Sequence, residues 1–246
     1  MTELPFTDEQ VSDSRESLVR TLPRGESTYL TLTQTVLGRL RQHIFDGVYP
    51  PGSRLNIADL ASQFDVSPVP VREALRNLET EGLVEFRPNR AIVVRELSGA
   101  EIRELFLMRV PLETLAAVHA ARHVQIQDLE NLERILYDMD AAIGTDRWHV
   151  LHDSFHRALY GLAGLPRVGQ LIDILRGQMR RYSMTFLSVR AHLTQAQAEH
   201  YALLEASKNQ DFEKIKAIMR EHLARPTQIA LHTLGFTNNV SEDPFN

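Results

Sequence analysis

The residues with the clearest capacity for chemistry are histidines, of which the chain has ten. His152 and His156 are four residues apart, a spacing that places two side chains on one side of an α-helix. His200 and His222 lie in two later helical segments. Imidazoles that converge from three helices inside a bundle would bind a borderline divalent cation, with zinc preferred and nickel or manganese as alternatives. Spacing alone favours solvated or capped histidines instead, because such pairs arise often by chance.

Residues 66–84 hold a second group with chemical potential, on a predicted short helix. Ser67 is suited to cap this helix, and Pro68 can occupy the first helical position, where its missing N–H costs nothing. Gly82 supplies a left-handed stop. Apolar residues recur at helical spacing and predict a core-facing side, formed by Val71, Leu75 and Leu78.

Two arginines, Arg72 and Arg76, lie four residues apart on a different side of this helix. Cations near the positive N-terminal end of a helix are suited to contact phosphates and base edges. The alternative for Arg72 is a surface cation paired with Glu73 or Glu79, and for Arg76 the two interpretations are equally open.

The surrounding elements have the order of a winged helix-turn-helix domain. Apolar periodicity predicts helices over residues 32–47 and 55–64, before the helix that starts at Ser67. Two β-prone runs, 83–86 and 92–94, flank the sequence Arg87-Pro88-Asn89-Arg90 and predict a hairpin with a basic tip.

The rest of the chain predicts helices only. Ser98 and Glu101 form a capping box at the start of a helix that runs to about residue 123, and Pro111 is expected to kink it. Further helical patterns cover residues 125–143, 147–163, 166–190, 195–207 and 211–234.

The predicted fold is mainly α, with a winged helix-turn-helix domain of three helices and a small β-hairpin followed by an all-α bundle of six to seven helices. The predicted divisions are a flexible arm at 1–27, a DNA-binding domain at 28–97, a helical domain at 98–235 and a tail at 236–246.

Composition limits the classes of partner and compartment. The formal net charge is −5, so any contact with DNA must use a local basic patch. The chain has no cysteine, which excludes disulfides and thiolate metal sites and is compatible with a reducing cytoplasm. It has no run of about 18 apolar residues and no secretory signal pattern, so we expect a cytoplasmic protein without a membrane span.

Residues 33–97 resemble the DNA-binding domain of the GntR family of bacterial transcription regulators. The matching pieces include Tyr49-Pro50-Pro51-Gly52-Ser53-Arg54-Leu55, Pro70-Val71-Arg72-Glu73-Ala74-Leu75, Glu81-Gly82-Leu83-Val84 and the basic wing. The resemblance implies phosphate and base contacts by Ser67 and Arg72, and minor-groove contacts by Arg87, Asn89 and Arg90. The sequence departs from the family at Pro68 and Val69, where an arginine and a hydroxyl residue are common.

Residues 98–235 resemble the FCD effector domain of the FadR subfamily. The matches are Phe155-His156-Arg157-Ala158-Leu159, Glu199-His200 with Leu203-Leu204-Glu205-Ala206, and Met219-Arg220-Glu221-His222-Leu223. The resemblance implies a metal held by one Asp or Asn and three His, with His152 in place of the carboxylate. Four neutral imidazoles would leave the ion's charge unbalanced and favour an anionic ligand. Asp153 points about 100° away from His152 on a regular helix and could replace it only if the helix rotated.

Arg109 is the candidate effector-binding residue. The Arg-x-x-x-Glu pattern that it forms with Glu113 resembles the start of the FCD domain, where the arginine often meets the carboxylate of an organic acid bound over the metal. A guanidinium binds a carboxylate in bidentate fashion. The alternative is an ion pair between Arg109 and Glu113 within the helix. Further candidates for polar pocket groups are Gln178, Arg180, Arg181 and Tyr182.

The leading functional hypothesis is a transcription regulator without enzymatic activity, and a repressor is the preferred interpretation. It would bind a palindromic operator as a homodimer and respond to a small carboxylate effector held near the metal. One alternative is a regulator that senses the metal itself. Another is a metal-dependent hydrolase with a DNA-binding domain, against which stands the absence of a His-Glu-x-x-His motif.

Overall fold

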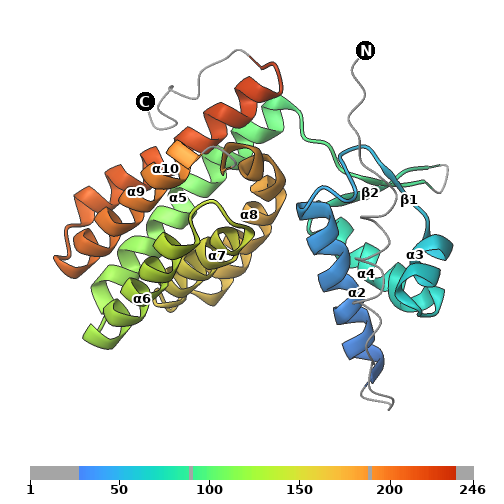
Figure 1. Cartoon of the computed structure of the whole chain (residues 1–246), viewed down its shortest axis with the longest axis horizontal. Helices are drawn as coiled ribbons and strands as arrows, with labels where there is room; N and C mark the ends of the chain where they lie inside the picture. Colours follow the sequence, from blue (N-terminus) through green and yellow to red (C-terminus); the bar gives the residue numbers. More distant parts are fainter. Residues whose placement is uncertain (1–27, 89–90, 188–189, 237–246) are drawn as a thin grey trace.

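The computed structural model describes residues 28–88, 91–187 and 190–236, and its elements form an N-terminal and a C-terminal group (Figure 1). The N-terminal group comprises helices α2 (Thr28–Phe45), α3 (Ile57–Phe64) and α4 (Pro68–Thr80) with strands β1 (Arg54–Leu55), β2 (Val84–Phe86) and β3 (Ile92–Val94). The predicted arm at 1–27 lies outside the described residues, as does the predicted tail beyond residue 236.

The sheet has a third strand that the sequence did not predict. Its order is β1-β3-β2, with both pairs antiparallel and Val93 placed between Arg54 and Glu85. The second helix was predicted to include Leu55, but this residue pairs with Ile92 and is buried. The helix begins after Asn56 because the Asn56 side chain accepts a hydrogen bond from the backbone N–H of Ala58 at 2.8 Å.

Helix α4 packs its predicted apolar side into the N-terminal core. Val71, Leu75 and Leu78 are fully buried with residues of α2, α3 and the sheet. Ser67 occupies the N-cap position, but its side chain makes no capping hydrogen bond, contrary to prediction. Gly82 follows the C-cap and adopts a φ of 70°, as expected of a left-handed stop.

The C-terminal group is an all-helical bundle. It comprises α5 (Gly99–His123), α6 (Ile126–Ala142), α7 (Asp146–Gly161), α8 (Pro166–Leu187), α9 (Arg190–Lys208) and α10 (Phe212–Thr233). The capping box is present, with Ser98 and Glu101 bonded to each other's backbone N–H. Helix α9 begins before the predicted boundary, so Thr194 lies inside it. The helical and winged parts of the predicted fold are thus confirmed.

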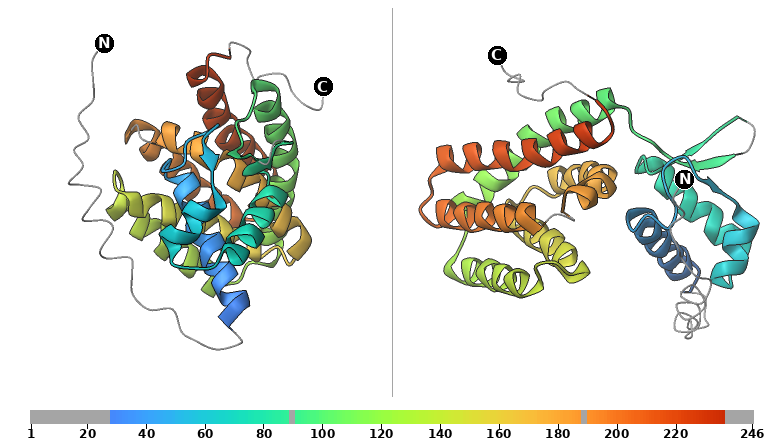
Figure 2. Two further views of the ribbon diagram at one scale, coloured as in Figure 1. Left: turned by 90° about the vertical axis from the view of Figure 1, so that its right-hand side faces the viewer. Right: turned by 45° about the horizontal axis from the view of Figure 1, so that its top comes forward.

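Helices α5 and α10, at the two ends of the bundle sequence, lie side by side, and α8 faces the N-terminal group (Figures 1 and 2). A small cluster at this junction joins the linker residue Leu97 to α5, α8 and α10 through Ile102, Met179, Tyr182 and Leu231. Among the described residues, no helix has both the length and the apolar composition needed to cross a bilayer.

Candidate metal centre and ligand cavity

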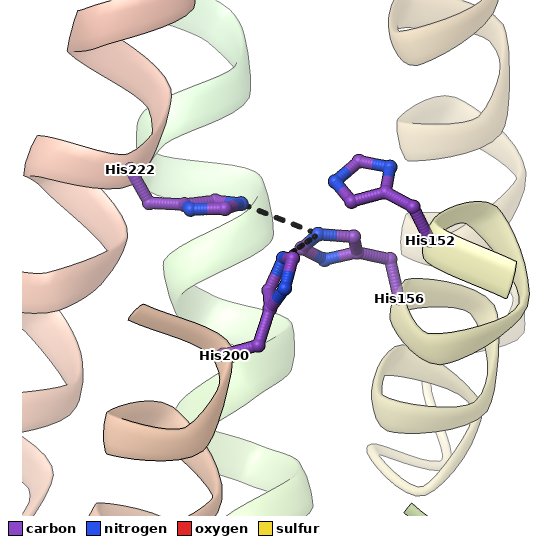
Figure 3. A group of neighbouring side chains, drawn as sticks. All are labelled: His152, His156, His200 and His222. Atoms are coloured by element: carbon purple, nitrogen blue, oxygen red, sulfur yellow. Dashed lines mark hydrogen bonds between the residues drawn. The ribbon is translucent and has the colours of Figure 1, made fainter. Parts of the chain in front are cut away.

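The four predicted metal-binding histidines meet inside the bundle (Figure 3). His152 and His156 project from successive turns of α7, His200 comes from α9 and His222 from α10. One ring nitrogen of each lies within 4.8 Å of the others. His156 and His200 are buried, at 0% and 1% exposure. The tertiary fold therefore brings together side chains that are up to 70 positions apart in the sequence.

The spacing of the ring nitrogens fits a divalent ion. His156 Nε2 lies 3.2 Å from His200 Nε2 and 3.3 Å from His222 Nε2. Zinc–nitrogen bonds of about 2.0–2.1 Å put two ligand atoms about 3.4 Å apart in a tetrahedron and about 2.9 Å apart in an octahedron. Both separations lie between these values, so each of these two pairs is spaced as ligands of one ion would be, while the four nitrogens together lie within 4.8 Å of one another.

Hydrogen bonds behind the cluster fix the tautomers of two histidines. Tyr160 donates its hydroxyl proton to Glu113 Oε2 at 2.7 Å, so the 3.1 Å contact with His156 assigns Nδ1–H of the imidazole as donor to the Tyr160 oxygen. His222 Nδ1 donates to Glu199 Oε2 at 2.8 Å. Both assignments leave the Nε2 lone pairs directed at the centre of the cluster, which is the arrangement that metal ligands require.

Burial keeps three histidines of the cluster uncharged at neutral pH. It lowers the pKa of His152 to about 4, and it lowers the pKa of His156 and His200 well below the ordinary value. The positive charge of Arg176 acts in the same direction on all three. Neutral imidazoles are the ligand-competent form, so no proton has to be removed before these three bind a metal.

Asp153 is not a member of the cluster. Its carboxylate accepts hydrogen bonds from Arg180 and, at 3.3 Å, from Arg176, both on α8. Its Oδ1 atom lies 3.9 Å from His152 Nδ1. Burial alone would raise the pKa of Asp153, but His152 and the two arginines hold it well below its ordinary value. The expectation that Asp153 points away from the metal ligands agrees with this arrangement.

Arg109 forms the ion pair that the sequence offered as the alternative to effector binding. Its Nε donates to Glu113 Oε1 at 2.7 Å, and both side chains are buried. Arg176 contacts the other carboxylate oxygen at 3.3 Å. Burial would raise the pKa of Glu113, but the two arginines and Tyr160 lower it. Arg109 nevertheless also lines a cavity beside the histidine cluster.

A cavity of about 540 Å³ opens beside His152 and His222. Its volume is in the range of sites for small organic ligands. Six arginines and four carboxylates line it, and its wall includes residues of the N-terminal group, namely Arg41, Phe45, Glu81 and Leu83. The cavity is therefore enclosed jointly by the bundle and by the domain that carries α4.

Helix α8 connects the cavity to the N-terminal group. The Arg180 guanidinium, which is bonded to Asp153, lies over the ring of Phe45 at 4.8 Å. Gln178 donates from its side-chain amide to the Glu81 carbonyl at 2.9 Å. A Cβ atom at Gly82 would lie 2.7 Å from that amide nitrogen, so glycine permits the close approach. Of the candidate pocket groups, Arg180 lines the cavity, whereas Gln178 binds the neighbouring domain.

The two predicted DNA-contact arginines of α4 differ in the interactions that they make within the chain. Arg72 is exposed and has no ion-pair partner within the described ranges. Arg76 pairs with Glu79 at 3.1 Å and lies over the Phe86 ring at 4.3 Å. The alternative considered for Arg72 was an ion pair with Glu73 or Glu79, but Glu79 pairs with Arg76 instead. Arg72 is therefore the freer of the two arginines.

The remaining predicted DNA contacts are at the helix start and in the wing. Ser67 is exposed at the start of α4. Arg87 pairs with Glu85 at 3.4 Å, while Asn89 and Arg90 lie outside the described residues.

Sequence reasoning missed the partners behind the histidines, above all Tyr160 and Arg176. Tyr160 lies four residues after His156, and this helical spacing was an available signal. Arg176 is four residues before Arg180 and shares its helix side. No local pattern, however, pairs either residue with Glu113.

Comparisons with known proteins match both parts of the chain. Residues 32–94 match the model of bacterial regulatory proteins of the gntR family, and residues 104–225 match the FCD domain. The HTH-type transcriptional regulator YdhC of Bacillus subtilis is 29% identical over 205 residues, which cover 74% of this chain and 90% of YdhC. The HTH-type transcriptional repressor RspR of Escherichia coli is 26% identical over 195 residues, which cover 78% of this chain and 86% of RspR.

The solved structure of Escherichia coli McbR/YncC is also similar, with a TM-score of 0.73 and 26% identity. The match covers 82% of this chain and 98% of McbR. A regulator from Rhodococcus, at 23% identity and a TM-score of 0.68, has the same fold. The chain therefore belongs to the GntR family of DNA-binding transcription regulators, with a GntR-type helix-turn-helix domain followed by an FCD domain.

Proposed function

We propose that this regulator is a repressor that binds a palindromic operator as a homodimer and responds to a small organic acid. The acid would lie over a divalent ion, preferably zinc, held by His152, His156, His200 and His222. The observation that carries the proposal is the lining of the cavity. His152 and His222 of the histidine cluster line it, and so do residues of the DNA-binding domain. A bound ligand would therefore contact both the sensing and the DNA-binding parts.

The charges around the cavity support an anionic ligand. Arginines outnumber carboxylates in its wall, and they still do so when the buried Glu113 is added. Four neutral imidazoles contribute no negative charge, so a divalent ion would increase the positive excess. A carboxylate ligand supplies the missing counter-charge and matches the bidentate geometry of an arginine such as Arg109.

The contacts of Asp153 suggest how the acid would act on the DNA-binding domain. An incoming carboxylate competes with Asp153 for Arg176 and Arg180, since both guanidinium groups lie at the cavity wall. Displacement of Arg180 would weaken its contact with Phe45 and shift α8 relative to α4. The acid can change operator affinity only by the difference between its affinities for the two arrangements.

Dimerisation is supported by an apolar stripe on α5. Leu107, Met108 and Leu115 are 44%, 38% and 42% exposed on the helix side that faces away from the bundle. One recognition helix reads only a few base pairs, and two-fold symmetry doubles the readout. A second copy of this chain is therefore the occupant that we propose for the stripe. The naming of RspR as a repressor supports the direction of regulation.

Metal analysis tests the proposed site directly. We expect close to one ion per chain in the wild-type protein and loss of most of it in His156→Ala and His222→Ala. His119→Ala, which changes a histidine of α5 outside the cluster, is the matched control. Unchanged metal content in both cluster variants would contradict the site.

A thermal-shift panel of mono-, di- and tricarboxylates, run with and without the metal, then distinguishes the functions. A true effector raises the melting temperature by mass action, and only in the metal-loaded protein. A response of operator binding to metal without any response to acids would favour the metal sensor. Turnover of an acid would favour the hydrolase, against which stands the naming of YdhC and RspR as transcription regulators.

A further inference from the structure

An apolar side chain is exposed where the recognition helix begins. Val69 is 48% exposed, although α4 buries its other valine, Val71, completely. Val69 therefore contributes little to the core of the domain. A fold-stabilising role does not account for a valine at this position.

Val69 lies on the side of α4 that faces away from the core. Positions 69, 72 and 76 follow the i, i+3, i+7 spacing of one helix side, and Val69, Arg72 and Arg76 are all exposed. The opposite side is buried through Val71, Ala74, Leu75 and Leu78. In helix-turn-helix proteins the N-terminal residues of the recognition helix contact base edges in the major groove. Val69 therefore occupies a base-reading position next to Arg72.

The first turn of α4 offers few polar groups that could read bases. Pro68 and Pro70 have no backbone N–H, so two of the usual free donors at a helix start are missing. Arg76, further along the helix, forms an ion pair with Glu79 and lies over the ring of Phe86. The groups nearest to the helix start are thus the methyl groups of Val69, the Ser67 hydroxyl and the Arg72 guanidinium.

We infer that Val69 reads thymine through its C5-methyl group, an inference that rests on the operator binding proposed above. Thymine is the base that presents a methyl group in the major groove, and apolar side chains recognise it by contact. Three helical residues span about 4.5 Å and one base-pair step about 3.4 Å, so the thymine lies one or two base pairs from the base that Arg72 contacts. Each operator half-site carries this thymine within two base pairs of a guanine read by Arg72.

The test removes single methyl groups from the DNA and leaves the wild-type protein unchanged. Operator duplexes are first selected from a random pool by the full-length protein. Each thymine of the selected site is then replaced by deoxyuridine, which lacks only the methyl group. At one thymine per half-site we expect a three- to fivefold rise in Kd, the value for one buried methyl group.

A variant shows which residue makes the contact. Val69→Ala should abolish the difference between thymine and deoxyuridine at that position and leave any other methyl effect unchanged. Val48→Ala, which changes a valine of 57% exposure outside α4, should keep the wild-type pattern. Sequence-specific binding with no sensitivity to any deoxyuridine, or full sensitivity in Val69→Ala, would overturn the inference. Failure to select any specific sequence would instead overturn the proposed operator binding, and the inference with it.

Discussion

The side-chain amide of Gln178 donates a hydrogen bond to the backbone carbonyl of Glu81, 2.9 Å away, and so ties α8 to the residue that ends the recognition helix. On the other side of α8, Arg176 and Arg180 hold Asp153, the neighbour of His152. One helix thus contacts both the candidate metal centre and the end of α4. In our proposal a ligand that moves α8 also moves the DNA-reading surface.

Gln178→Ala should weaken the response of operator binding to the acid. We expect the ratio of the Kd values with and without acid to fall several-fold from its wild-type value, because couplings of this kind are typically 5- to 150-fold. Metal content should stay unchanged. Fluorescence anisotropy with labelled operator measures the ratio, and Gln127→Ala on the exposed surface of α6 is the control. A full wild-type ratio in Gln178→Ala would show that this hydrogen bond does not transmit the signal.

Tyr160→Phe should lower metal affinity by about 10- to 100-fold, as is typical when a partner of a ligating histidine is lost. The substitution keeps the aromatic ring but removes the oxygen that accepts from His156 and the hydroxyl that donates to Glu113. Competition with a chromophoric chelator measures the affinity. Tyr137→Phe, at a 72% exposed tyrosine of α6, serves as control. Equal affinities in all three proteins would argue against a role for Tyr160 in holding the ligand.

Chelator-treated protein should lose stability as the pH falls from about 6.5 to about 4. The pKa of His152 is about 4 in the folded chain and near 6.5 in the unfolded chain, so the unfolded chain binds more protons throughout this window. The free energy of unfolding then falls by about 1.4 kcal/mol per pH unit for each histidine that titrates only when unfolded. His156 and His200 add to the effect in the same direction. Urea unfolding at several pH values measures how the free energy of unfolding depends on pH. His152→Phe should reduce the slope of this dependence. An unchanged slope would contradict the lowered pKa of His152.

Arg72→Ala should abolish operator binding and leave the metal content unchanged. Arg72 is exposed without an ion-pair partner among the described residues, whereas Arg76 is held by Glu79. A base contact is worth about 1–3 kcal/mol, and the loss is counted twice in a symmetric dimer. Arg76→Ala should have a smaller effect, and Arg39→Ala on α2 almost none. If Arg72→Ala binds with unaltered affinity and salt dependence, α4 is not the reading helix.

Local sequence was sufficient to predict most of the helices and the two wing strands, whereas the identity of the clustered histidines came from the resemblance to the FCD domain. Apolar periodicity and caps predicted α4 and α5, because these signals act within a few residues. The strand β1 was missed because two residues carry no period, and its pairing with β3 depends on a residue 37 positions away. Arg109 illustrates a third case: its helical spacing from Glu113 predicted the pair, but the contact of Arg176 with the same carboxylate exists only in the folded bundle.

The most direct test of the central claim is the operator affinity of the full-length protein, measured with and without its metal and with and without the acid identified by thermal shift. We expect the acid to change the Kd of the metal-loaded wild-type protein at least fivefold. We also expect this change to disappear after chelator treatment and in His156→Ala. The same acid-induced change in metal-free His156→Ala would contradict the claim that the acid acts through a metal held by the four histidines.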